Sequence, residues 1–108
     1  MTQDESQILR QQRLFLDQLD QSVKHVNREI IHGVIPKLNA DVFTKMAEGV
    51  ARHRVRYLAA ATQLAGEEPL TAAQYAQLKS LREQFDESRL AFDAVKRAIS
   101  RGYIDMAE

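Results

Sequence analysis

The sequence predicts an all-α protein, a long antiparallel three-helix bundle in up-down-up order with coiled-coil-like packing. Three segments carry apolar residues at seven-residue spacing, and a row of this kind runs along one side of a helix. The three rows are Leu16, Val23 and Ile30, then Phe43, Val50, Tyr57 and Leu64, then Leu78, Phe85, Phe92 and Ile99. Each row needs another helix to cover it. Because the connections between the rows are short, neighbouring helices should run antiparallel.

The composition is that of a single domain, residues 1–108, with enough apolar residues to form a core. Hydrophobic residues make up 44% of the chain, but Trp is absent and Tyr and Phe total seven, so the core should be mainly aliphatic. The chain has no Cys, which excludes disulfides, thiolate zinc sites and cysteine nucleophiles. Fifteen basic and fifteen acidic side chains give zero net charge, which argues against nucleic acid and acidic lipid as partners.

The N-terminal residues argue for a cytoplasmic protein. Residues 1–6 are polar and acidic, the opposite of the basic start of a secretory signal. No apolar run approaches the roughly 18 residues that a membrane span requires. We therefore expect no membrane association.

The first helix is expected over about 5–32. Asp4 or Ser6 can cap its N-terminal amide groups. Gly33 is a plausible end, and Pro36 cannot continue a regular helix. The alternative is that the first and second segments form one long helix with a kink at Pro36.

The second and third helices are expected over about 40–65 and 71–100. Asn39 or Asp41 should cap the second helix, and Gly66 should end it in a left-handed conformation. The third helix has the best start signal in the chain.

At the start of the third helix, Thr71 is a natural N-cap residue, and Gln74 three positions later completes a capping box. Gly102 ends the helix, and an apolar tail over 103–108 then either docks on a partner or frays.

One group of residues in the first helix has the spacing of metal ligands. His25, Glu29 and His32 lie on one face, and Glu29-x-x-His32 is a pair used in carboxylate-bridged metal bundles. The pair occurs once, however, and at 100° per residue the two histidines lie opposite the apolar row. We therefore favour a solvated face, with a metal site at Glu29 and His32 as the alternative.

Basic residues are concentrated in the middle of the chain. Residues 24–57 hold seven Lys and Arg against three Asp and Glu, giving +4, whereas 1–23 and 58–108 each sum to −2. Nucleic-acid binding by the middle helix is a second alternative. The residues that would carry it are Lys45, Arg52, Arg54 and Arg56. Because Tyr57 is the only aromatic residue among them, base stacking would be poorly supported.

Arg54 is expected to behave differently from the other basic residues. The apolar face of the second helix should consist of Phe43, Ala47, Val50, Tyr57, Ala61 and Leu64. Arg54 falls inside this arc, so its guanidinium must pair with a carboxylate, lie at an interface or extend back to solvent. Asp20, Asp86 and Asp93 are the candidate carboxylates.

The sequence offers little support for catalysis. No glycine-rich phosphate loop is present, and two of the three histidines map to an outer face. We therefore expect a non-enzymatic interaction module without a cofactor: an adaptor, a chaperone or an assembly factor. It should self-associate as a twofold dimer and bind an as yet unidentified protein partner through helix faces. The candidate partner-binding residues are Phe15, Ile31, Arg54, Leu58, Leu90, Tyr103 and Ile104.

Overall fold

The computed structural model describes residues 3–35 and 37–107. Within these ranges the chain forms three long helices and two very short strands. In chain order the elements are α1 (Gln3–Val34), β1 (Lys37–Leu38), α2 (Ala40–Gln63), α3 (Ala72–Ser100) and β2 (Asp105–Met106). The predicted all-α class with three helices is confirmed.

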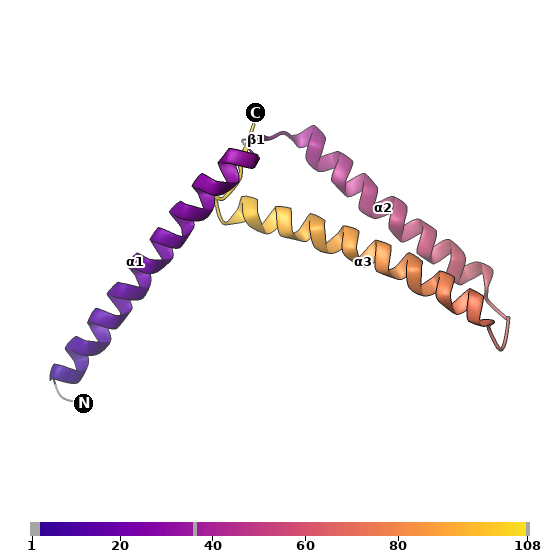
Figure 1. The fold of residues 1–108 in the computed structure, drawn as a ribbon, viewed down its shortest axis with the longest axis horizontal. Coiled ribbons are helices and arrows are strands. Elements are labelled where there is room, and N and C mark those ends of the chain that lie inside the picture. Colours follow the sequence, from indigo (N-terminus) through magenta and orange to yellow (C-terminus); the bar gives the residue numbers. More distant parts are fainter. Residues whose placement is uncertain (1–2, 36, 108) are drawn as a thin grey trace.

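Helices α2 and α3 pack along each other as an antiparallel pair, which we call the hairpin (Figure 1). The predicted apolar rows of the two helices meet there. The rings of Phe43 and Phe92 lie 4.8 Å apart between centroids, a favourable distance for tilted aromatic rings. Val50 is 7% exposed and is the best-buried side chain of the hairpin among the described residues.

The buried face of α2 is rotated from the one that the sequence predicts. Met46 and His53 are half-buried, whereas Ala47 and Ala61 are exposed. A seven-residue row identifies the centre of a face only approximately. Because a single neighbouring helix covers a narrow arc, one edge of the predicted face stays in solvent.

Helix α1 extends away from the hairpin and touches the rest of the chain near its own C-terminal end (Figure 1). The molecule measures 70 × 43 × 18 Å and has a radius of gyration of 22.5 Å. A compact chain of this length would have a radius of gyration of roughly 13 Å. The up-down-up arrangement of three helices side by side is therefore not formed within one chain, and the bundle is limited to α2 and α3.

The predicted caps of the second and third helices agree with the structure, whereas the predicted end of the first helix at Gly33 is wrong because α1 continues to Val34. Asn39 caps α2 by accepting a hydrogen bond from the amide of Val42 at 2.9 Å. The backbone torsion φ of Gly66 is +85°, in the left-handed region expected after this helix.

The capping box of α3 is present. The amide of Gln74 donates to the Thr71 hydroxyl at 3.1 Å, and the Thr71 amide donates to the Gln74 side chain at 2.8 Å. Gly102 follows the helix with φ of +76°.

The first two helices are separate rather than one kinked helix. Helix α1 passes through Gly33 and ends at Val34, while α2 begins at Ala40, with β1 between them. The expected break at Pro36 lies outside the described residues.

The C-terminal tail docks on the segment that follows α1. Strands β1 and β2 pair in parallel, with Lys37 opposite Asp105. The amide of Ala107 then donates to the carbonyl of Leu38 at 2.6 Å. Ile104, just before β2, is 5% exposed. The tail therefore neither frays nor waits for a partner, the two outcomes expected from the sequence, but packs against its own chain.

Candidate interaction surface

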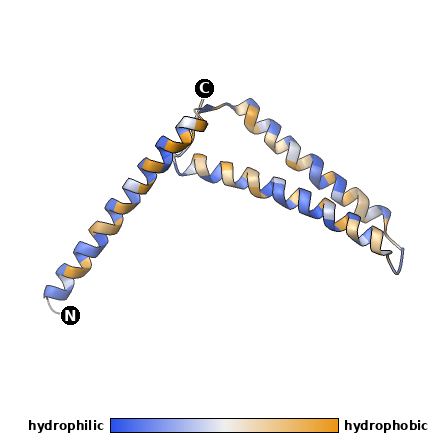
Figure 2. Cartoon of the chain, in the orientation of Figure 1, coloured by the Kyte–Doolittle hydropathy of each residue, from blue (hydrophilic) through white to orange (hydrophobic). Residues whose placement is uncertain are grey.

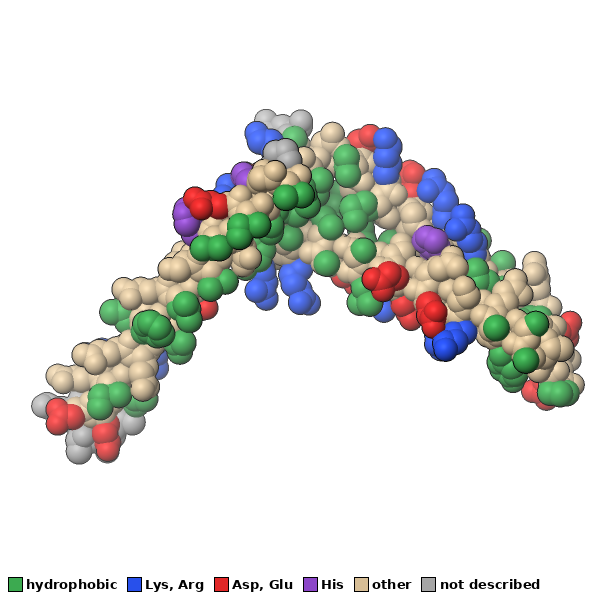
Figure 3. Space-filling model, in the orientation of Figure 1, with side chains coloured by type: hydrophobic (Ala, Val, Ile, Leu, Met, Phe, Trp, Pro, Cys, Tyr) green, Lys and Arg blue, Asp and Glu red, His purple; other side chains and the backbone are tan. Residues whose placement is uncertain are grey.

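The most prominent surface feature is a continuous apolar stripe on α1, which we call the α1 stripe. Its members follow the heptad spacing and are 45–65% exposed. They are Ile8, Leu9, Phe15, Leu16, Leu19, Val23, Val26 and Ile30. Apolar residues recur along the whole of α1 in Figure 2, and Figure 3 shows hydrophobic side chains gathered along the helix up to its junction with the hairpin. Within the described residues nothing covers this stripe.

The hairpin has no comparable surface. It has five exposed large apolar residues, and these do not follow a seven-residue spacing on either helix. They are Val42, Val55, Leu58, Tyr75 and Leu90. Isolated apolar side chains of this kind are normal on a protein surface, whereas a contiguous stripe indicates an interaction site.

The total surface of the chain supports the same conclusion. The accessible surface is 8580 Å² for a mass of 12.3 kDa. A compact monomer of this mass would expose roughly 6,100 Å². The chain therefore exposes roughly 2,500 Å² more than a globular monomer does, and a standard interface buries about 800 Å² on each partner.

The seven candidate partner-binding residues do not form one surface. Phe15, at 62% exposure, lies in the part of α1 that points away from the hairpin, whereas Leu58 and Leu90 lie on the hairpin. Ile31 and Tyr103 are half-buried. Ile104 is buried within the chain, so the tail part of the expected surface packs intramolecularly.

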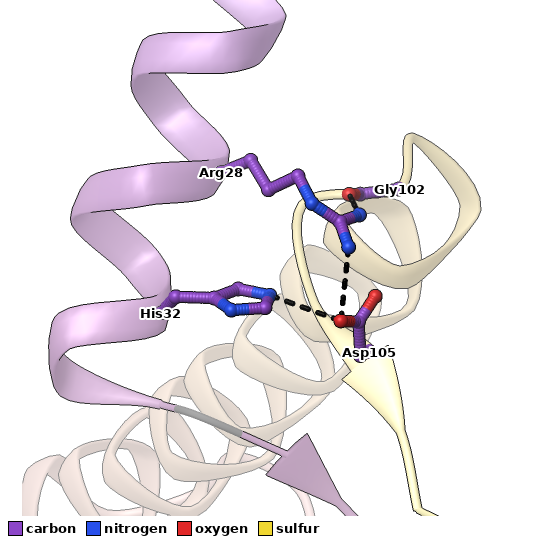
Figure 4. A network of polar contacts seen from close by, with 4 residues as sticks. All are labelled: Arg28, His32, Gly102 and Asp105. Carbon is purple, nitrogen blue, oxygen red and sulfur yellow. Dashed lines mark hydrogen bonds and ion pairs between the residues drawn. The ribbon is translucent and has the colours of Figure 1, made fainter.

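A polar cluster joins α1 to the tail, and we call it the elbow cluster: Arg28, His32, Gly102 and Asp105 (Figure 4). The Arg28 guanidinium donates to the carbonyl of Gly102 at 2.8 Å and to Oδ2 of Asp105 at 3.0 Å. The side chains of Arg28 and Asp105 are 44% and 33% exposed. This forked contact fixes the tail against the last turns of α1.

His32 approaches the same carboxylate from the next turn of α1. Its Nε2 atom lies 3.2 Å from Oδ2 of Asp105 and is shielded from solvent. The contact is an ion pair whenever the imidazole is protonated. This cluster was not predictable from the sequence because Asp105 belongs to the tail, and nothing in the tail indicates where it docks.

The proposed metal-ligand residues point to different partners. His25 and Glu29 lie 3.1 Å apart and are 69% and 68% exposed, as a solvated pair on one helix. His32 faces Asp105 instead. Among the described residues no group of three or more His, Asp or Glu side chains could hold a metal ion.

Three of the four proposed nucleic-acid residues lie on the outer face of α2. Successive residues are 100° apart, so Lys45, Arg52 and Arg56 share this face. Lys45 pairs with Asp41 at 3.2 Å, and Arg52 pairs with Glu48 at 3.4 Å. These exposed i,i+4 pairs support the helix and partly neutralise the basic face.

Arg54 lies at the edge of the hairpin contact. It is exposed, and its guanidinium carbon lies 5.2 Å from the centre of the Phe85 ring, within the range of a cation–π contact. Among the described residues Arg54 forms no ion pair with an expected carboxylate, because Asp86 and Asp93 lie beside Arg89 instead. Its side chain extends back to solvent beside the aromatic ring, which is one of the three arrangements expected for it.

Comparisons with known proteins add no assignment to this geometry: no family model, no curated protein and no solved structure matches the chain. None of the helices in the described ranges combines the length and the apolar character needed to cross a membrane.

Proposed function

We propose that this protein is a helical protein–protein interaction module whose α1 stripe binds a partner helix. The observation that carries this proposal is the heptad stripe, whose eight large apolar side chains are all at least 45% exposed. A stripe of this width matches the groove-binding face of an amphipathic helix, in which apolar residues recur every three or four positions.

The energetics of an isolated helix support the proposal. Most helical stability in proteins comes from packing of the apolar face, and isolated helices in water are marginal. Helix α1 spans 32 residues but contacts the rest of the chain only near its end. A partner on the stripe would supply the missing packing and would cover part of the surface excess.

We further propose that the module acts without catalysis and in the cytoplasm. The first statement rests on the absence of a glycine-rich phosphate loop and of Cys from the sequence, and the absence of Cys also suits a reducing compartment. An adaptor, a chaperone subunit or an assembly factor each requires an exposed helical surface of this kind.

The proposal is tested by two matched leucine substitutions on α1. Leu16 lies in the stripe and Leu14 on the opposite face, and they are 56% and 58% exposed. Leu16→Glu should abolish binding of the partner chain, whether a second copy or another protein, because it places a charge in the apolar contact. Leu14→Glu should bind normally. Native mass spectrometry of complexes purified from the source cells, together with sedimentation of the pure chain, measures both effects.

Circular dichroism should show that both variants remain helical, which separates loss of binding from loss of folding. If the unaltered chain is monomeric and carries no partner, or if the two variants behave alike, the proposal is wrong.

A further inference from the structure

We infer that the occupant of the α1 stripe is α1 of a second copy of this chain, packed antiparallel across a twofold axis between residues 17 and 18. This inference rests on the proposed function and specifies its partner. Four features of the described residues point to it: the layer pattern of the stripe, the charges at its edge, the charge difference along α1 and the position of the elbow cluster.

The stripe has the layers that an antiparallel pair requires. Leu9, Leu16 and Val23 recur every seven residues, with Leu19 and Val26 three residues after the last two. In the proposed register Leu16 of one copy faces Leu19 of the other, and Leu9 faces Val26. Val23 faces Gln12, so four of the six layers are fully apolar and two contain an amide side chain. These layers span residues 9–26 and stop before the elbow cluster begins at Arg28, so the tail of each copy stays docked.

The edge charges favour the antiparallel orientation. Arg13 and Asp20 are seven residues apart on one edge of the stripe, and neither takes part in an ion pair within the described chain. In an antiparallel pair, matching edges face each other, so Arg13 of each copy lies opposite Asp20 of the other. In a parallel pair the same edge would face Ile8 and Phe15, and both charges would lie against apolar side chains.

The charge distribution along α1 also favours the antiparallel orientation. Residues 4–20 hold four acidic and two basic side chains, whereas residues 24–34 hold two basic and one acidic. Antiparallel packing places the acidic half of each helix beside Lys24 of the other, whereas Arg28 lies on the opposite face and pairs with Asp105. Parallel packing would place like charges together, which is unfavourable.

A partner's hairpin fits the stripe less well than a partner's α1 does. The exposed apolar residues of the hairpin are five and scattered, so they form no row to face the stripe. Two α1 helices instead bring equal rows together. At half exposure, the twelve stripe side chains that lie between residues 9 and 26 of the two copies correspond to an interface of roughly 900 Å², at the low end of the range for specific contacts.

Charge exchange is the first test. Arg13→Asp and Asp20→Arg each replace two ion pairs per dimer by like-charge contacts, and each should weaken the dimer roughly ten-fold. The double variant Arg13→Asp/Asp20→Arg recreates the pairs between copies and should return the dissociation constant to nearly the original value. Because the two positions are roughly 10 Å apart on one helix, this rescue cannot arise within a chain. Sedimentation equilibrium measures the dissociation constants.

Disulfide formation is the second test. Because the chain has no native Cys, every disulfide must form between introduced Cys residues. An oxidised mixture of Arg13→Cys and Asp20→Cys chains should give the mixed dimer, and neither variant alone should cross-link. Identical positions are then separated along the helices by roughly 14 Å at residue 13 and roughly 8 Å at residue 20, both beyond disulfide reach. Val23→Cys is the matched control: it faces itself in a parallel pair but lies roughly 16 Å from itself in the antiparallel one.

The outcomes separate the inference from the proposed function. Rescue by the double charge variant together with the mixed disulfide supports the antiparallel pair. A dimer without rescue, a Val23→Cys cross-link, or binding of a different protein to the stripe overturns the inference and leaves the proposed function standing. A chain that stays monomeric and carries no partner overturns both.

Discussion

Removing the charge of Asp105 should raise the population of chains whose C-terminal tail is undocked, without unfolding the hairpin. Asp105 accepts a hydrogen bond from Arg28 at 3.0 Å and lies 3.2 Å from Nε2 of His32. Asp105→Asn preserves the size of the side chain and one oxygen acceptor but removes the charge that attracts both groups.

The expected effect is small because the cluster is partly solvated. Arg28, His32 and Asp105 are 44%, 35% and 33% exposed, so water and salt screen the attraction. An exposed ion pair contributes 0–1 kcal/mol, and the two contacts together should contribute about 1 kcal/mol. A change of this size should raise the population of chains with an open tail about five-fold.

Hydrogen exchange of single amides can measure this opening. The amide of Ala107 is bonded to the carbonyl of Leu38 only while the tail is docked, so its exchange should accelerate about five-fold. The amide of Val50, inside the hairpin, should exchange at an unchanged rate. Asp93→Asn is the matched control, because Asp93 meets Arg89 at 3.8 Å on the surface of α3, away from the tail contacts.

Unchanged exchange at Ala107 in the Asp105 variant would show that the backbone pairing of β1 with β2 holds the tail by itself. Equal acceleration at Ala107 and Val50 would show that the tail and the hairpin unfold together. Either result would refute the local role assigned to the elbow cluster.

Four further substitutions should alter stability, each measured by urea unfolding followed by circular dichroism. Val50→Ala removes two buried methyl groups at the best-packed point of the hairpin and should cost about 2 kcal/mol, whereas no loss would mean that the hairpin core lies elsewhere. Thr71→Ala removes the capping box of α3 and should cost about 1 kcal/mol, and restoration by Ser would identify the hydroxyl as the cause. Gly102→Ala should cost about 1–2 kcal/mol because φ there is +76°, whereas Gly33→Ala, inside α1 with open space around it, should stabilise by about 0.5–1 kcal/mol.

Local features of this chain were predictable from the sequence because their physics is local. Asn39 and Thr71 cap the helices as predicted, since a side-chain oxygen within three residues of an unpaired amide is sufficient. Gly66 adopts the predicted left-handed conformation, and Gly102, predicted only to end the third helix, adopts it as well, because each lies in the turn just after a helix.

The pairing of β1 with β2 was not predictable from the sequence. The strands are two residues each and lie far apart in the sequence, so neither shows an alternating apolar pattern. The elbow cluster depends on this pairing, because it brings Asp105 within reach of Arg28 and His32. Tyr103 and Ile104 were expected on a partner-binding surface because the pairing of β1 with β2, which docks the tail, was not foreseen.

The arrangement of α1 shows a different limit of the sequence. A heptad row indicates that a helix needs a partner but does not indicate whether that partner belongs to the same chain. The apolar rows of α2 and α3 pack against each other within the hairpin, as the contact between Phe43 and Phe92 shows. The row of α1 has the same spacing and is left uncovered.

The stripe and the elbow cluster occupy different faces of α1, and this makes their roles separable. At 100° per residue, Arg28 and His32 lie about half a turn from the centre of the stripe. A second copy can therefore dock on the stripe without displacing the tail. Leu16→Glu should abolish the dimer but leave the rate of amide hydrogen exchange at Ala107 unchanged. Asp105→Asn should accelerate exchange at Ala107 but leave the dissociation constant of the dimer within about two-fold, because the charge it removes is far from the proposed layers. A dimer weakened as strongly by Asp105→Asn as by Leu16→Glu would instead place the tail inside the interface.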